Sequence, residues 1–170
     1  GVRINPGNIG GEERVRAVVA AAADTGAVIR VGVNSGSLQR DLRDLEARDP
    51  AGALVESAVR YCALLEGMGF ESIKVSAKSS SPLVTIAANR ALAERIPYPL
   101  HIGVTEAGTR WAGSIRSSVA LGVLLADGVG DTIRVSLTGD PVEEVRVALE
   151  ILRTLGLAPR GPRVISCPTC

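Results

Sequence analysis

The 170-residue chain has few of the residues on which nucleic-acid binding and disulfide chemistry usually depend. Only 2% of its residues are aromatic, and it contains one histidine and three cysteines. So few rings leave little surface on which nucleobases could stack. The 19 basic and 18 acidic residues nearly cancel to a net charge of +1, so no overall field attracts nucleic acid or an anionic membrane. The composition therefore argues against nucleic-acid binding.

The sequence also lacks the segments that direct a chain into or across a membrane. No charged stretch followed by an apolar one stands at the N-terminus, and no run of about 18 apolar residues occurs. Three cysteines are too few and too unevenly spaced for a disulfide framework. We therefore expect a cytoplasmic protein without membrane contact. Its 46% hydrophobic content is sufficient for the core of one domain.

A regular alternation of short strand-like runs and longer helical stretches fills the chain. The strand-like runs are rich in Val or Ile and are followed by Gly, Ser, Asn or Pro. Asp49 and Ser81 stand where helix N-caps are expected, and residues 37–49 predict a charged excursion or a short helix. The predicted strands are residues 2–5, 28–34, 72–78, 100–105, 132–137 and 163–167, and the predicted helices are residues 11–23, 51–68, 82–95, 114–127 and 141–155.

This alternation predicts the α/β class with a parallel sheet, either doubly wound or closed as a TIM-type (β/α) barrel. Strands of a sheet covered on both faces should be almost entirely apolar. Here one face of five successive strands is polar while the other is Val or Ile. A solvated antiparallel sheet is the alternative, but it needs tight hairpins in place of helical connections. The polar faces carry Arg3 and Asn5; Arg30, Gly32 and Asn34; Lys74, Ser76 and Lys78; His101, Gly103 and Thr105; and Arg134 and Ser136.

We therefore expect a parallel TIM-type barrel that is incomplete in this chain, with about six of its eight strands. Buried Arg or Lys without partners would destabilise a packed interior by several kcal/mol each, roughly, so the cations indicate an anionic ligand at the barrel mouth. Guanidinium groups bind phosphate or carboxylate with two hydrogen bonds, and Lys adds point charge. The Walker and dinucleotide fingerprints are absent. The cations are Arg3, Arg30, Lys74, Lys78 and Arg134, and their number would match a diphosphate.

Active sites of such barrels lie at the carboxyl ends of the strands. Asn5, Asn34, Lys78 and Ser136 are expected there, and Glu106 is the carboxylate that follows a strand in this region. Glu106 is either a general acid or base or the ion-pair partner of an arginine. His101 lies deeper on the polar face and is either a ligand contact or a hydrogen-bonded core residue.

The last four residues, Cys167-Pro168-Thr169-Cys170, place two thiols at C-x-x-C spacing. Two thiolates supply half of a tetrahedral zinc site or of an iron–sulfur cluster, so the other ligands would come from further residues or another chain. A redox dithiol and a chain end with two unpaired thiols are the alternatives. Cys167 falls at the same end of its predicted strand as the cationic mouth, so we expect the two features to form one site.

Six ordered segments together resemble the 4-hydroxy-3-methylbut-2-enyl diphosphate synthase family over essentially the whole chain. The combination in this order is far more specific than any one segment. The segments are residues 3–10 (RINPGNIG), 30–38 (RVGVNSGSL), 74–78 (KVSAK), 101–108 (HIGVTEAG), 130–137 (GDTIRVSL) and 167–170 (CPTC).

The resemblance implies a reaction of isoprenoid biosynthesis by the methylerythritol phosphate route. In that reaction 2-C-methyl-D-erythritol 2,4-cyclodiphosphate is reductively opened and dehydrated, with electrons that come from ferredoxin or flavodoxin through a [4Fe–4S] cluster. Glu106 would face the reacting part of the substrate, and Cys167 and Cys170 would be two cluster ligands. From the polar stripe we add His101 and Arg134 to the expected substrate contacts. The implied diphosphate contacts are Arg3, Asn5, Arg30, Asn34, Lys78 and Ser136.

The resemblance also implies a domain division. Residues 1–166 would be a partial barrel that binds substrate, and residues 167–170 would begin the iron–sulfur segment that leads to a C-terminal domain. In the family a third Cys and a Glu of that domain complete the cluster, commonly over the barrel mouth of the partner in a homodimer. We therefore expect the 170-residue chain alone to be inactive. The alternatives are a non-redox barrel that binds phosphate esters and carries structural zinc at the terminal cysteines, and a plain interaction module.

Overall fold

The computed structural model describes residues 1–159, and its strands are all parallel. Strands β1 (Val2–Ile4), β2 (Ile29–Asn34) and β3 (Ile73–Lys78) form one sheet in chain order. Strands β4 (His101–Ile102) and β5 (Thr132–Ile133) form a second pair. A parallel bridge between Val75 and Leu100 joins the two groups, so the strands follow one another in space as in sequence. The predicted strand 163–167 and the terminal cysteines lie outside the described residues.

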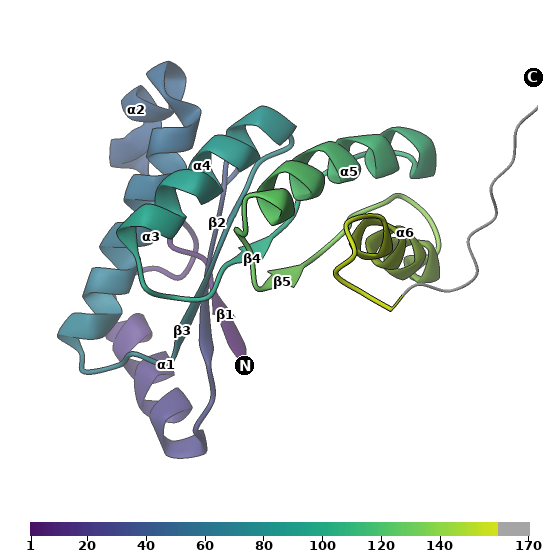
Figure 1. Cartoon of the computed structure of the whole chain (residues 1–170). Coiled ribbons are helices and arrows are strands. Elements are labelled where there is room, and N and C mark those ends of the chain that lie inside the picture. Colours follow the sequence, from purple (N-terminus) through teal and green to yellow (C-terminus); the bar gives the residue numbers. More distant parts are fainter. Residues whose placement is uncertain (160–170) are drawn as a thin grey trace, which may run out of the picture.

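A helical segment follows each strand, as the sequence predicts (Figure 1). The connection after β2 also holds the predicted charged excursion, which forms a 3-10 turn and a short helix. No helix between residues 1 and 159 combines the length and the apolar character needed to cross a membrane. The helices are α1 (Glu12–Thr25), α2 (Arg43–Arg48) after the 3-10 turn η1 (Arg40–Leu42), α3 (Pro50–Gly67), α4 (Pro82–Arg95), α5 (Arg110–Ala126) and α6 (Pro141–Thr154).

The predicted N-caps of α3 and α4 are confirmed. The carboxylate of Asp49 accepts from the Gly52 amide at 2.9 Å, and the Ser81 hydroxyl accepts from the Val84 amide at 3.4 Å. Helix α5 begins at Arg110, one turn before the predicted start at residue 114. The reason is Thr109, whose hydroxyl accepts from the Ala112 amide and caps the earlier turn.

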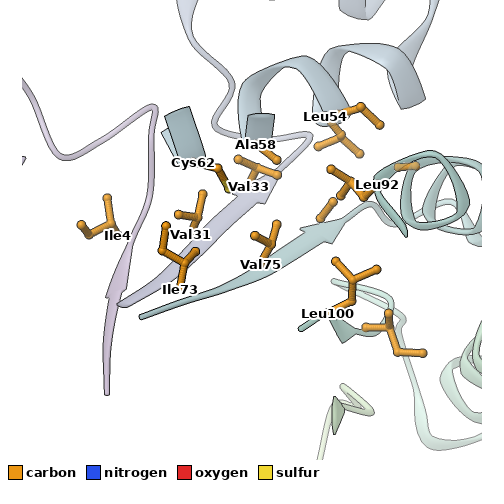
Figure 2. Close-up of a cluster of buried hydrophobic side chains, with 14 of the residues drawn as sticks. Ile4, Val31, Val33, Leu54, Ala58, Cys62, Ile73, Val75, Leu92 and Leu100 are labelled. Carbon is orange, nitrogen blue, oxygen red and sulfur yellow. The ribbon is translucent and has the colours of Figure 1, made fainter. Parts of the chain in front are cut away.

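The hydrophobic core lies between the Val and Ile face of the strands and helices α1, α3 and α4. Figure 1 shows these helices along one side of β1–β3, and Figure 2 shows Val31 and Val75 in a cluster with Leu54 and Leu92 from the helices. All four side chains are fully buried. The alternate residues of the strands therefore face away from these helices, which confirms that the polar stripe is a separate face.

Two predicted strands are shorter than expected, because residues 100–105 yield only β4 and residues 132–137 only β5. The Arg134 amide still donates to the Ile102 carbonyl at 2.9 Å. Beyond that point the chain after β4 turns toward β3, where the Thr105 amide donates to the Ser79 carbonyl at 3.1 Å. Strand β5 thus loses its partner, and residues 135–137 continue without backbone hydrogen bonds to β4.

We expect Leu92→Ala to lower the free energy of unfolding by about 2–5 kcal/mol, because it leaves a cavity between α4 and the sheet. Leu83→Ala on the same helix is the matched control. Leu83 is 74% exposed, whereas Leu92 is 0% exposed, so the control should change stability by less than about 0.5 kcal/mol. Urea denaturation followed by circular dichroism measures both. Equal losses would contradict the packing described for α4.

Candidate active site

The strand register places cationic side chains next to one another. Arg3 of β1 pairs with Arg30 of β2, and Arg30 pairs with Lys74 of β3. Nearer the carboxyl ends, Asn34 pairs with Lys78. Neighbouring strands lie about 4.8 Å apart, so residues at the same level on one face are in close proximity. The parallel sheet therefore gathers charges that are widely separated in sequence.

Gly32 makes room for one of these charges. The Arg3 side chain lies over Gly32, where a Cβ atom would meet the guanidinium, and its Nη2 donates to the Gly32 carbonyl at 3.4 Å. A larger residue at position 32 would push Arg3 away from the face. Glycine in the polar stripe is thus part of the arrangement of the cations.

A small inner cavity of about 90 Å³ opens on the polar face of the strands. We call Arg3, Arg30, Lys78 and Arg134 the cation cluster, and all four line this cavity. Among the described residues, none of the four has a carboxylate within 4 Å. Four cations without acidic partners are complementary to a multiply charged anion. The other lining residues are Val33, Asn34, Ser76 and Thr105.

A larger outer cavity of about 460 Å³ adjoins the inner one and shares Arg3, Asn34 and Thr105 with it. Its lining consists mainly of amides and hydroxyls, with Glu106 as its carboxylate. Such groups donate and accept hydrogen bonds, as a hydroxylated carbon skeleton requires. The remaining lining residues are Asn5, Asn8, Ser35, Gly36 and Ser37.

Lys78 shows the electrostatic cost of this arrangement. Its side chain is buried, and the residue is 7% exposed. Burial, followed by the charges of Arg134, Arg30 and Arg3, lowers the pKa of Lys78 to about 7. The pKa of Arg30 is lowered as well, first by burial and then by Arg3 and Arg134. A negative charge placed among these side chains would offset both effects, so the cluster is complementary to an anion.

His101, on β4, lines neither cavity. Its Nδ1 is 2.8 Å from the Thr132 hydroxyl on the neighbouring strand. Burial lowers the pKa of His101 to about 4, with Lys78, Arg30 and Arg134 adding to the shift. The ring is therefore neutral at pH 7. The structure places it as a hydrogen-bonded partner within the sheet, and its contact with substrate stays a prediction.

Glu106 has an unusual backbone conformation at the edge of the outer cavity. Its φ of 51° is the only positive φ of a non-glycine residue within 1–159. L residues in this region are strained by about 1–2 kcal/mol. The loop is held by the Thr105 amide on the Ser79 carbonyl and by Arg116, which donates to the Ala107 carbonyl at 3.0 Å. Glu106 is exposed and forms no ion pair with any described residue.

The cavities bring together most of the predicted site residues. Among the described residues, the exceptions are Lys74, His101 and Ser136, which line neither cavity. Ser76 and Thr105 line the inner cavity and were visible as members of the polar stripe. Asn8, Ser35 and Ser37 line the outer cavity but lie in loops, where no periodic pattern marks a residue as part of a site. Their proximity follows from the packing of loops 5–9 and 34–38.

The described residues supply no metal site. No group of three or more His, Cys, Asp or Glu side chains in residues 1–159 is arranged to hold a metal ion. Cys62 is buried in α3, and burial, with Glu66, raises the pKa of its thiol to about 12, so it is an inert core residue. The predicted ligands Cys167 and Cys170 lie outside the described residues.

Lys78→Met should alter how stability depends on pH in the absence of anions. In the unfolded chain Lys78 keeps its proton up to about pH 10.4, whereas in the folded protein it loses it near pH 7. The unfolded state thus binds more protons between these values, and Lys78 makes stability rise with pH there, by at most about 1.4 kcal/mol per pH unit.

Denaturation of both proteins between pH 7 and pH 9 in phosphate-free buffer measures this effect. We expect Lys78→Met to be more stable than the wild type at pH 7 and the difference to shrink as the pH rises. Parallel pH curves would show that Lys78 is not held at a repulsive, desolvated position.

Replacing Glu106 by glycine and by alanine separates its backbone strain from its carboxylate. Both variants lose the carboxylate, but only glycine adopts a φ of 51° without strain. We expect Glu106→Gly to be more stable than Glu106→Ala by about 1 kcal/mol, because both lack the carboxylate and differ only in strain. The melting temperatures of the two variants measure the difference. A glycine variant no more stable than the alanine variant would contradict the strain.

Comparison with known proteins agrees with this geometry. The protein-family model of the GcpE TIM-barrel domain matches residues 1–149. A relative from Geobacter sulfurreducens, named 4-hydroxy-3-methylbut-2-en-1-yl diphosphate synthase (flavodoxin), is 55% identical over 170 residues, which cover 100% of this chain and 48% of the relative. A protein of the same name from Desulfotalea psychrophila is 58% identical over 172 residues, with 99% of this chain and 47% of the relative covered.

A third relative of that name, from Lawsonia intracellularis, is 56% identical over 170 residues, with 100% of this chain and 47% of the relative covered. The chain spans about half the length of the curated relatives it matches. Parallel strands in chain order, helices between them and a family match over most of the sequence agree with the predicted α/β fold and with the resemblance. The chain belongs to the GcpE family and carries residues of its TIM-barrel domain.

Proposed function

We propose that the full-length protein containing this chain converts 2-C-methyl-D-erythritol 2,4-cyclodiphosphate into 4-hydroxy-3-methylbut-2-enyl diphosphate by reductive ring opening and dehydration. The observation that carries this proposal is the cation cluster, whose members have no carboxylate partner among the described residues. The names of the relatives support the same reaction. They give no support to the alternative, a non-redox barrel with structural zinc.

The two cavities suit the two halves of this substrate. The diphosphate would lie against the cation cluster, where Arg3, Arg30 and Arg134 offer paired N–H donors and Lys78 offers a concentrated charge. The hydroxylated carbon skeleton would lie in the outer cavity among the amides and hydroxyls. His101 and Ser136 are proposed as further contacts from their place on or after the strands of the polar stripe. Bound in this way, the substrate would offset the burial and the cationic repulsion that lower the pKa of Lys78.

Glu106 is the proposed acid or base of the reaction. Loss of water requires a proton on the departing oxygen, and a positioned carboxyl group supplies one. Glu106 lines the outer cavity, at the proposed position of the carbon skeleton, and the strained backbone aims it from the loop after β4. Strain at such a position is typical of residues whose orientation matters for function.

Electrons would reach the substrate through an iron–sulfur centre. Cys167 and Cys170 offer thiolates, which are the ligands that such clusters take, so the donor chemistry fits although two ligands are too few. When bound, the [4Fe–4S] cluster supplies electrons that come from ferredoxin or flavodoxin. Flavodoxin is favoured because it stands in the names of the relatives.

The whole protein would complete both the barrel and the cluster. Residues 1–166 would form part of a barrel that other residues of the protein complete, and residues 167–170 would begin the iron–sulfur segment. The remaining cluster ligands would come from a further domain, brought to the barrel mouth in a homodimer. A cytoplasmic location suits unpaired thiols and a reducible cluster.

An anaerobic assay of the full-length protein tests the reaction, with reduced flavodoxin as electron donor and product formation followed by phosphorus NMR. We expect conversion of the cyclodiphosphate in the wild type. Cys167→Ser should lose both the conversion and the electron paramagnetic resonance signal of the reduced cluster, because an alcohol replaces a thiolate ligand.

Cys62→Ala is the matched control for this variant. Cys62 is buried in α3, away from the proposed site, so its replacement should leave the cluster signal and the turnover in place. A zinc-containing protein without the resonance signal would favour the structural-zinc alternative. An unchanged cluster signal in Cys167→Ser would remove Cys167 from the ligand set.

A further inference from the structure

The direction of one hydrogen-bond chain at the outer cavity is fixed by a backbone amide. The Gly7 N–H can only donate, and it donates to the Oδ1 of Asn5 at 3.1 Å. The other end of the Asn5 amide is therefore its NH₂ group. This Nδ2 donates to the hydroxyl oxygen of Ser37 at 2.8 Å. The backbone amide of Gly7 thus fixes Asn5 as the donor in its hydrogen bond to Ser37, 32 residues away.

Ser37 in turn donates a hydrogen bond to Asn34. Its hydroxyl oxygen already accepts from Asn5, so its own hydrogen is free to donate, and it donates to the Oδ1 of Asn34. With Oδ1 occupied, the Nδ2 of Asn34 keeps two N–H donors, which have no hydrogen-bond partner in the described part of the chain. Asn34 lines both the inner and the outer cavity. The free donors are therefore available to a ligand in the cavities.

The two loops that carry this chain are packed too tightly to slide. A side chain at Gly7 would collide with the Ser37 carbonyl oxygen, so the loops meet backbone against backbone. The Tyr61 hydroxyl donates to the Pro6 carbonyl at 3.1 Å and ties the first loop to α3. The Ser37 amide donates to the Asn34 carbonyl at 3.1 Å and closes the second loop. The hydrogen-bond chain is thus built into a rigid support.

We propose that Ser37 is a positioning residue that holds the Asn34 amide with its N–H donors toward the diphosphate. This inference rests on the proposed function, because it assumes that an anion occupies the cavities. An Asn side chain can turn over at little cost, since its two ends have nearly the same shape. The reversed amide would present its carbonyl oxygen to the anion. Ser37 disfavours that orientation, because its hydroxyl hydrogen would then lose its acceptor, the Oδ1 of Asn34.

Binding of inorganic pyrophosphate to the full-length protein, measured by isothermal titration calorimetry, tests this role. We expect Ser37→Ala to weaken binding about five- to tenfold, because the Asn34 donors are no longer directed at the anion. Asn34→Ala should weaken it by at least as much. In the Asn34→Ala background, Ser37→Ala should change the dissociation constant by less than about twofold, since Ser37 acts through Asn34. Ser37→Thr, which keeps the hydroxyl, should restore most of the affinity.

A merely structural role for Ser37 predicts a different pattern. Its replacement would then weaken binding to the same extent whether or not Asn34 is present, and it would lower the melting temperature without ligand. Such additivity, or a wild-type affinity in Ser37→Ala, would overturn the inference while the anion site stands. Absence of pyrophosphate binding in the wild type would overturn both. Ser118→Ala, an exposed serine on α5, is the matched control and should bind like the wild type.

Discussion

Repulsion between like charges on the polar face of the parallel strands is the constraint on which the rest of this structure depends. Four cations surround a cavity of about 90 Å³, and the ion pairs of the described residues all lie elsewhere. Lys78 carries the largest consequence because it is the most deeply buried of them. An arrangement of this kind destabilises the free protein and is stabilised by a bound anion. Because the cations are already in place, binding would require little rearrangement of the site.

The packing of the fold must hold the cationic side chains close together in spite of this repulsion. The apolar face of β1–β3 packs on α1, α3 and α4, and this core fixes the strands and hence the positions of the cations. Capped helix starts and the tight contact between the loops at Gly7 and Ser37 hold the strand ends in place. Rigid support also explains how Glu106 keeps a strained backbone and how a chain of hydrogen bonds can control the orientation of Asn34. The apolar core that stabilises the fold thus lies on one face of the sheet, and the cation cluster lies on the other.

The helices and most of the cation cluster could be predicted from local sequence patterns. The helices agree with prediction to within a few residues, because apolar spacing, Pro at the first turn and capping residues are local signals. The period-two stripe predicted five neighbouring cations, because parallel strands in register align their alternate residues. Four of them line the inner cavity, whereas Lys74 does not. The lengths of β4 and β5 were overestimated, since a strand ends where its partner leaves, and the turn of the chain toward Ser79 has no local signature.

The sequence by itself determined the family, the α/β alternation and the cationic character of the polar face, because these depend on residue types and on their spacing along the chain. Only the tertiary structure decided which polar residues share a cavity, that Lys78 is buried among three arginines, and that Glu106 has a positive φ. It alone revealed Ser37, whose role depends on two loops that meet in space. Burial, strain and hydrogen-bond direction are set by distances between residues remote in sequence, and no local pattern encodes those distances.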